Sequence, residues 1–259
     1  MTSGTRDTRI ELKSAREIGL LRTVGRLSAK ILMDLKRQVR AGMTTRDVDV
    51  MAEKMMRQQG AIPSFLNYRG YPATVCTSVN EEVVHAIPGP RCLKDGDILS
   101  LDIGMFLSGY CGDTATTFVI GTVSEEARQL MKAGAASLEA SIHAAVVGNR
   151  LGDVSYAMQS VVEKAGYQVV REYGGHGIGR AMHEEPHVPC FGTPNTGMRL
   201  VPGMVLALEV MANAGTAEIK HKSDGWTVVT ADNRLSVHYE KMVALTDQGT
   251  EVLTPHDDF

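Results

Sequence analysis

The chain has 259 residues, of which 43% are hydrophobic and 22% are charged, a composition typical of a globular protein with a sizeable core. Its formal net charge is −3, and its 27 basic residues are scattered along the sequence. This balance gives no electrostatic reason to expect stable binding to nucleic acid or to an anionic membrane surface. We therefore expect no sequence-specific nucleic-acid partner and no membrane partner.

Several other classes of protein are disfavoured by what the sequence lacks. Residues 1–13 are polar, and no apolar stretch approaches the ~18 residues that cross a bilayer. The four cysteines show no Cys-x-x-Cys spacing, which argues against a structural zinc site or a redox centre. Neither a P-loop nor a Gly-x-Ser-x-Gly motif is present. We expect a cytoplasmic protein with reduced thiols. Because these other motifs are absent, we expect its chemistry to depend on a bound metal.

The first half of the chain predicts two helices followed by strands. A capping box at Ser14–Glu17 precedes apolar residues at helical spacing, which predicts a helix as far as about Gln38. Hydroxyl caps around Thr44 open a second helix, and Gly60 ends it. The next segments read as strands near 74–79, 97–106 and 110–120.

The second half repeats this order. Helices are expected near 124–147 and 152–165, before strands near 168–171, 204–213, 225–230 and 236–245. The glycines at 42 and 60 recur 106 residues later, and the segment 93–103 recurs 107 residues later, which places Asp102 on Glu209. We interpret the chain as a short N-terminal extension (1–13) and one α+β domain (14–259). Its two halves, about 14–121 and 122–250, should enclose the site.

Five side chains are candidate metal ligands: Asp102, Asp113, His176, Glu209 and Glu240. The four carboxylates fall in expected strands. Burying an unpaired charge costs roughly several kcal/mol of folding free energy unless a cation compensates it. Strand periodicity lets Asp102 and Asp113 point into one pocket from neighbouring strands. Oxygen-rich ligands with a single imidazole suit two divalent ions of manganese, iron or cobalt, with zinc as a less specific option.

Ordinary roles compete with this interpretation. A single Asp or Glu in a strand is more often a surface or hairpin residue than a ligand. The glycines around His176 fit either a flexible turn or a close backbone approach to a ligand. His85 and His183 could equally be buried histidines that satisfy a carbonyl group.

Five motifs nevertheless resemble those of the type I methionine aminopeptidases over nearly the whole chain. They are Asn80-Glu81-x-Val83-Val84-His85, Asp102 followed by Gly112-Asp113-Thr114, Gly174-Gly175-His176-Gly177-Ile178-Gly179, His183-Glu184-Glu185-Pro186, and Asp224-Gly225-Trp226 before Glu240. The resemblance implies a pita-bread fold with a dinuclear metal site between two pseudo-symmetric halves around an antiparallel sheet.

The same resemblance implies a role for each ligand. Asp113 and Glu240 would bridge two metals, Asp102 would bind one, and His176 and Glu209 would bind the other. Glu209 would also carry protons, while His85 and His183 would contact the substrate amide and the tetrahedral intermediate.

The resemblance also implies a pocket for a methionine side chain, because a thioether packs well on aromatic edges. Its lining would be Phe65, Tyr68, Tyr71, Cys76, His85, Met182, His183 and Trp226. Ala86 and Met182 depart from the family pattern, in which a glycine and an aromatic residue are common at these two positions. Fine specificity is therefore open.

The predicted function is removal of the initiator methionine from nascent proteins with a small second residue, by hydrolysis of the first peptide bond with a metal-activated water. Nascent chains would be the partners, with the ribosome as a further candidate, and the enzyme is expected to be a monomer. One alternative is a proline-directed peptidase on the same fold. A non-catalytic pita-bread binding protein is another, although such proteins should have lost ligands.

Overall fold

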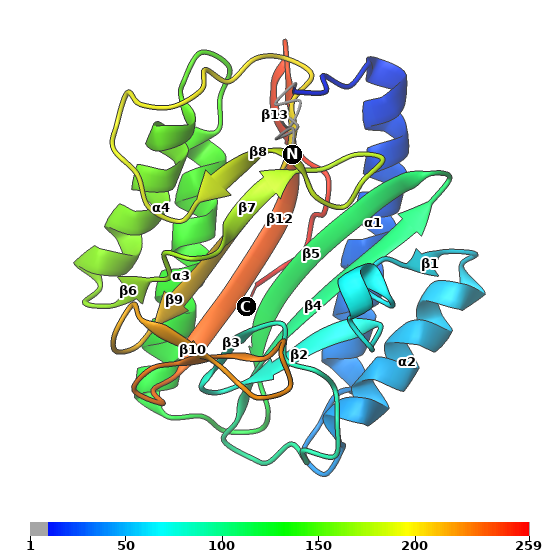
Figure 1. Cartoon of the computed structure of the whole chain (residues 1–259), viewed down its shortest axis with the longest axis vertical. Helices are drawn as coiled ribbons and strands as arrows, with labels where there is room; N and C mark the ends of the chain where they lie inside the picture. Colours follow the sequence, from blue (N-terminus) through cyan, green and yellow to red (C-terminus); the bar gives the residue numbers. More distant parts are fainter. Residues whose placement is uncertain (1–9, 259) are drawn as a thin grey trace, which may run out of the picture.

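The structure is a computed structural model that describes residues 10–258 (Figure 1). Of the N-terminal extension expected over 1–13, residues 1–9 lie outside the described residues. Residues 10–13 are described, and Lys13 is packed against the domain, where its backbone N–H donates to the carbonyl of Gly203 at 2.7 Å.

Two helices precede the strands of the first half, as predicted. The elements are α1 (Ala15–Gln38), α2 (Thr45–Gln58), β1 (Ile62–Pro63), the 3₁₀ turn η1 (Tyr68–Gly70), β2 (Val75–Val79), β3 (Glu82–Val84), β4 (Ile98–Leu107) and β5 (Tyr110–Val119). The capping box of α1 is confirmed, since the Glu17 N–H donates to Ser14 Oγ and the Ser14 N–H donates to Glu17 Oε2.

The second half repeats the order of helix, helix and strands. It comprises α3 (Glu125–Ala144), α4 (Leu151–Lys164), β6 (Gln168–Val169), β7 (Gly174–Gly177), β8 (Glu184–Pro189), β9 (Val205–Asn213), β10 (Ile219–His221), β11 (Val228–Thr230), β12 (Ser236–Thr246) and β13 (Gly249–Val252). The strands β7 and β8 were not predicted, because glycine and proline are rare in strand interiors.

Ten strands form one large antiparallel sheet with the central order β1-β4-β5-β12-β9-β7-β8, and a separate three-stranded sheet has the order β10-β11-β3. Helix α1 packs on β4 and β5, and α3 packs on β9 and β12, so the helices lie along one face of the sheet (Figure 1). Each half has its own apolar cluster, with Leu21 and Leu101 in the first and Leu138 and Leu208 in the second. The expected α+β architecture is confirmed.

The two halves meet where β5 lies beside β12, and we call this junction the seam. The two strands at the seam are paired over fewer residues than the strand pairs on either side. Strands β4 and β5 are paired along their whole length, as are β9 and most of β12, but the pairing between β5 and β12 is registered only at Glu240 and Ala115. Threonine hydroxyls bridge the rest. Thr114 Oγ1 donates to the Glu240 carbonyl at 2.8 Å, and Thr117 Oγ1 donates to the His238 carbonyl and accepts from the His238 N–H, both at 2.9 Å.

No helix within residues 10–258 is long and apolar enough to cross a membrane.

The seam yields a stability prediction. Thr117→Val keeps the shape of the side chain but leaves a buried carbonyl at His238 without its donor, which should lower the free energy of unfolding by about 1–3 kcal/mol. Urea unfolding of the metal-free protein measures this. Thr23→Val, whose hydroxyl bonds within the exposed face of α1, should change the value by less than about 0.5 kcal/mol. Equal losses in the two variants would contradict a special role for the seam hydroxyls.

Candidate metal centre and substrate pocket

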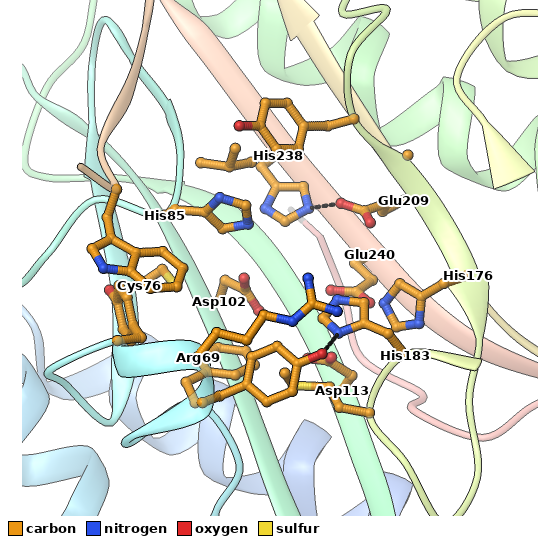
Figure 2. A pocket seen from close by; sticks show the side chains of 18 of the residues that line it. Arg69, Cys76, His85, Asp102, Asp113, His176, His183, Glu209, His238 and Glu240 are labelled. Atoms are coloured by element: carbon orange, nitrogen blue, oxygen red, sulfur yellow. Dashed lines mark hydrogen bonds and ion pairs between the residues drawn. The ribbon is translucent and has the colours of Figure 1, made fainter. Parts of the chain in front are cut away.

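Three carboxylates lie in one row across the sheet. The register pairs Asp102 with Ala115, Ala115 with Glu240, and Glu240 with Glu209. Directly opposed residues of antiparallel strands point to the same face, and so does Asp113, two residues before Ala115. Figure 2 shows the four carboxylates around one cavity of about 310 Å³.

His176 reaches the same cavity from β7, which lies between β8 and β9. A Cβ atom on Gly175 would lie 2.2 Å from the carbonyl oxygen of Ala207, and one on Gly177 would lie 2.2 Å from that of Glu185. No side chain fits such spaces. These glycines therefore reflect close packing of three strands rather than a flexible turn.

The donor set fits divalent cations. The buried oxygens Asp102 Oδ1, Asp113 Oδ1 and Glu240 Oε1 have no hydrogen-bond partner among the described residues. Ligand atoms of Asp113, His176 and Glu240 lie within 4.8 Å of one another. His176 Nδ1 lies 2.9 Å from the Gly177 carbonyl, so it carries the proton and leaves Nε2 free to bind a metal.

Burial without a cation changes how these carboxyl groups titrate. It raises the pKa of Asp102 to about 7, and it raises the pKa of Asp113 and of Glu240 well above the ordinary range, with further repulsion from neighbouring carboxylates. For Glu209, burial acts in the same direction, but the hydrogen bond from His238 and the nearby imidazoles outweigh it and lower the pKa to about 2.

His238 is a pocket residue that the sequence analysis missed. Its Nε2 lies 2.9 Å from Glu209 Oε2, and its side chain is buried (Figure 2). Burial alone lowers the pKa of His238, yet the bond to Glu209 and the negative charges around it raise the pKa overall. The sequence could have predicted this position. His238 precedes Glu240 by two residues in a strand, so the two side chains share one face of the sheet.

Apolar and aromatic side chains line the rest of the cavity: Phe65, Tyr68, Tyr71, Cys76, Met182 and Trp226. Tyr71 and Trp226 meet edge to face with ring centroids 5.1 Å apart, and Tyr71 Oη donates to the carbonyls of Val75 and Ala86. Burial raises the pKa of the Cys76 thiol well above its usual range. Cys76 is therefore a protonated wall residue and not a nucleophile.

Two further histidines face the cavity. His85 has φ 58°, a strained conformation for a residue other than glycine, and its ring meets Tyr173 edge to face at 5.2 Å. The His183 ring centroid lies 4.3 Å from that of His176, and His183 Nδ1 lies 2.9 Å from Tyr68 Oη. Burial lowers the pKa of each to about 4, so both are neutral at pH 7.

The structure thus brings every candidate site residue from the sequence to one cavity. It adds lining residues that were not among the predicted site residues: Arg69, Val84, Glu172, Tyr173, Gly174, His187 and His238.

Comparison with known proteins identifies this class of site. Residues 19–247 match the model of metallopeptidase family M24, and the chain belongs to that family. It is 46% identical to methionine aminopeptidase 1 of Bacillus subtilis, over 93% of this chain and 98% of the relative. The crystal structure of methionine aminopeptidase from Rickettsia prowazekii superposes with a TM-score of 0.94 at 36% identity, covering 95% of this chain and all of that one. The resemblance inferred from the motifs and the pita-bread fold are confirmed.

The fold alone extends further. A Xaa-Pro dipeptidase from Bacillus anthracis superposes with a TM-score of 0.76 at 20% identity, covering 96% of this chain but 63% of that one. The sheet is therefore shared with peptidases of different names, and specificity must be sought in the residues around the cavity.

The raised carboxyl pKa values predict proton release on metal binding. Near pH 6 the metal-free site holds protons that free carboxyl groups, with pKa values near 4, have already lost. A cation must displace these protons, so affinity for Mn²⁺ should rise from pH 6 to pH 8. Calorimetry at both pH values, in two buffers of different ionisation enthalpy, measures the affinity and the protons released. An affinity that does not change with pH would contradict the assignment.

Proposed function

We propose that this protein removes the initiator methionine from nascent proteins that carry a small second residue. A single observation supports this most strongly. The cavity that gathers four carboxylates and His176 continues into an apolar, aromatic wall of the size and character that a thioether side chain requires. The relatives named methionine aminopeptidase agree with it. The site draws on both halves of the chain, so we assign the activity to residues 14–259 as one domain.

The centre would hold two divalent ions, with manganese, iron or cobalt as candidates and zinc as a less specific option. Asp102, Asp113, His176, Glu209 and Glu240 would hold these ions, and Asp113 and Glu240 would be shared between them. The metals, when bound, supply Lewis acidity for the scissile carbonyl and lower the pKa of the attacking water.

The walls would bind and orient the substrate. Met182 and Phe65 are buried, and Trp226 packs on the edge of Tyr71, so the methionine side chain would displace water from a preformed pocket. Cys76 completes the apolar surface.

Glu209 would carry the proton, and His183 would donate a hydrogen bond to the substrate. The water oxygen attacks the carbonyl carbon, and Glu209 accepts the proton that the water loses and passes it to the leaving amine as the C–N bond breaks. His238 keeps Glu209 in place through the bond at 2.9 Å. With Tyr68 Oη donating to its Nδ1, neutral His183 carries its proton on Nε2 and can donate to the scissile amide, while His85 lies across the cavity.

We further propose a cytoplasmic enzyme that acts on polypeptides near the ribosome. All four cysteines are free, as the cytoplasm would keep them, and initiator methionines emerge there. We propose a monomer, because one chain supplies every residue of the described site.

One assay separates this function from proline-directed cleavage. Metal-free protein is reconstituted with Mn²⁺ and incubated with Met-Ala-Ser or Ala-Pro-Ala, and the free amino acids are quantified. We expect methionine from the first peptide and no hydrolysis of the second. Cleavage of Ala-Pro-Ala alone would support a proline-directed peptidase, and cleavage of neither would support a non-catalytic binding protein.

Asp113→Ala should abolish hydrolysis and lower the metal content. A bridging carboxylate serves both ions, so its loss removes ligands from each and leaves their positive charges facing one another. Metal analysis and the Met-Ala-Ser assay measure the two effects. Asp34→Ala, on the exposed side of α1, should keep both metal and activity. Full metal occupancy with normal turnover in Asp113→Ala would refute the dinuclear assignment.

His183→Ala should behave differently. Loss of one hydrogen bond that strengthens in the transition state typically lowers kcat by about 10²–10³, with little change in KM. The variant should keep its metal and its fold, as shown by metal analysis and circular dichroism. Tyr68→Phe, which removes only the group that orients His183, should give a smaller loss of kcat. Loss of metal from His183→Ala would make that residue a ligand, and an unchanged kcat would make it a packing residue.

A further inference from the structure

The residues that follow the two bridging candidates point away from the cavity. Neighbouring residues in a strand face opposite sides of the sheet, so Thr114 and Lys241 lie on the helix face when Asp113 and Glu240 lie on the cavity face. Thr114 is fully buried and Lys241 is nearly so. Whatever holds these two residues therefore acts on the backbone that carries the bridging carboxylates.

The C-terminal segment, residues 254–258, holds them from the helix face. Asp258 joins the two strands of the seam, because its Oδ1 accepts from Thr116 Oγ1 of β5 at 3.0 Å and its Oδ2 accepts from Lys241 Nζ of β12 at 2.7 Å. His256 Nε2 lies 2.9 Å from Thr114 Oγ1, the hydroxyl that donates to the Glu240 carbonyl. Figure 1 shows this end of the chain beside β5 and β12.

This segment is built into the domain and is not a loose tail. The side chain of His256 is fully buried and that of Asp258 is 6% exposed. Burial raises the pKa of Asp258, but His256 and Lys241 outweigh it and lower the pKa overall, so the carboxylate is charged. Thr254 Oγ1 accepts from the backbone N–H of Met242 at 2.9 Å.

One flanking helix contacts the segment itself, and the other contacts Lys241, the partner of Asp258. Lys36 of α1 donates to the carbonyl of Asp257 at 3.2 Å, and Glu139 of α3 accepts from Lys241 at 3.1 Å. A polar cluster thus runs from α1 to α3 across the seam. The low local dielectric strengthens the hydrogen bonds of this cluster. One member is unsatisfied, since His256 Nδ1 lies 3.2 Å from Asp258 Oδ1 but makes no hydrogen bond among the described residues.

The strand pairing at the seam explains why additional contacts between β5 and β12 are needed. Its backbone pairing is registered at one position only, so backbone hydrogen bonds set the spacing of β5 and β12 less firmly there than elsewhere in the sheet. We infer that the C-terminal segment is a positioning element that clamps the seam and so sets the spacing of Asp113 and Glu240 for metal binding.

The inference rests on the proposed function only in taking Asp113 and Glu240 as metal ligands. Asp258 and His256 touch neither substrate nor metal and act through the strands, which makes them positioning residues. Partners behind metal ligands typically contribute about 10–100-fold to metal affinity or activity. Asp258→Asn, which keeps the size of the side chain and removes its charge, should weaken Mn²⁺ binding by a factor in that range.

The test is titration of metal-free, full-length protein with Mn²⁺ by calorimetry, with thermal unfolding of the metal-free forms measured in parallel. The matched control is Asp257→Asn, because Asp257 is the next residue, carries the same charge and is exposed. Its Mn²⁺ affinity should stay within about twofold of the wild type. Asp258→Glu, which retains the charge, should recover part of the affinity lost in Asp258→Asn. If Asp258→Asn does not fold, Thr116→Val removes a single donor to Asp258 and should still weaken binding.

The outcomes separate a positioning role from a structural one. Weaker Mn²⁺ binding in Asp258→Asn, with recovery in Asp258→Glu, supports the inference. A lower unfolding temperature with unchanged Mn²⁺ affinity overturns it, since the segment would then only stabilise the fold. If the wild type cleaves Met-Ala-Ser and Asp258→Asn binds Mn²⁺ normally, the inference fails while the proposed function stands. If neither peptide is cleaved but Asp258 controls Mn²⁺ affinity, the reverse holds.

Discussion

The structure depends on one electrostatic constraint, which is the gathering of four carboxylates in a buried cavity at the middle of the sheet. Glu240 and Glu209 stand directly opposite each other in the register, an arrangement that is unfavourable for like charges unless a cation lies between them. Ala115 occupies the place between Asp102 and Glu240 in the row, and its small side chain leaves room there. The direct opposition of two carboxylates would destabilise an ordinary sheet. Here it brings acidic side chains together where a cation can bind.

The seam between the two halves follows from this constraint. Asp113 and Glu240 come from different halves, on β5 and β12, and these strands lie side by side without a full backbone ladder. Thr114 and Thr117 supply hydroxyl groups that satisfy the backbone of β12 where strand pairing does not.

Much of the fold and site could be predicted from the sequence because both have periodic signals. A capping box located the start of α1 and hydroxyl caps located that of α2, and alternation in β4 and β5 placed Asp102 and Asp113 on one face. The strand β7 was missed because its glycines are required by the close approach of β8 and β9. That approach is visible only in the assembled sheet. His238 could have been found by extending the alternation from Glu240. The contacts of Asp258 had no sequence signal, since they join segments far apart in the chain.

His238 also compensates part of the negative charge in the cavity. Three of the carboxyl groups, Asp102, Asp113 and Glu240, have raised pKa values and can neutralise themselves by keeping protons. Glu209 does not need to, because the imidazole of His238 donates to it and has a raised pKa of its own. Protons and one histidine thus provide part of the positive charge that two divalent ions would bring. Binding of a divalent cation would then exchange protons for metal at these carboxyl groups.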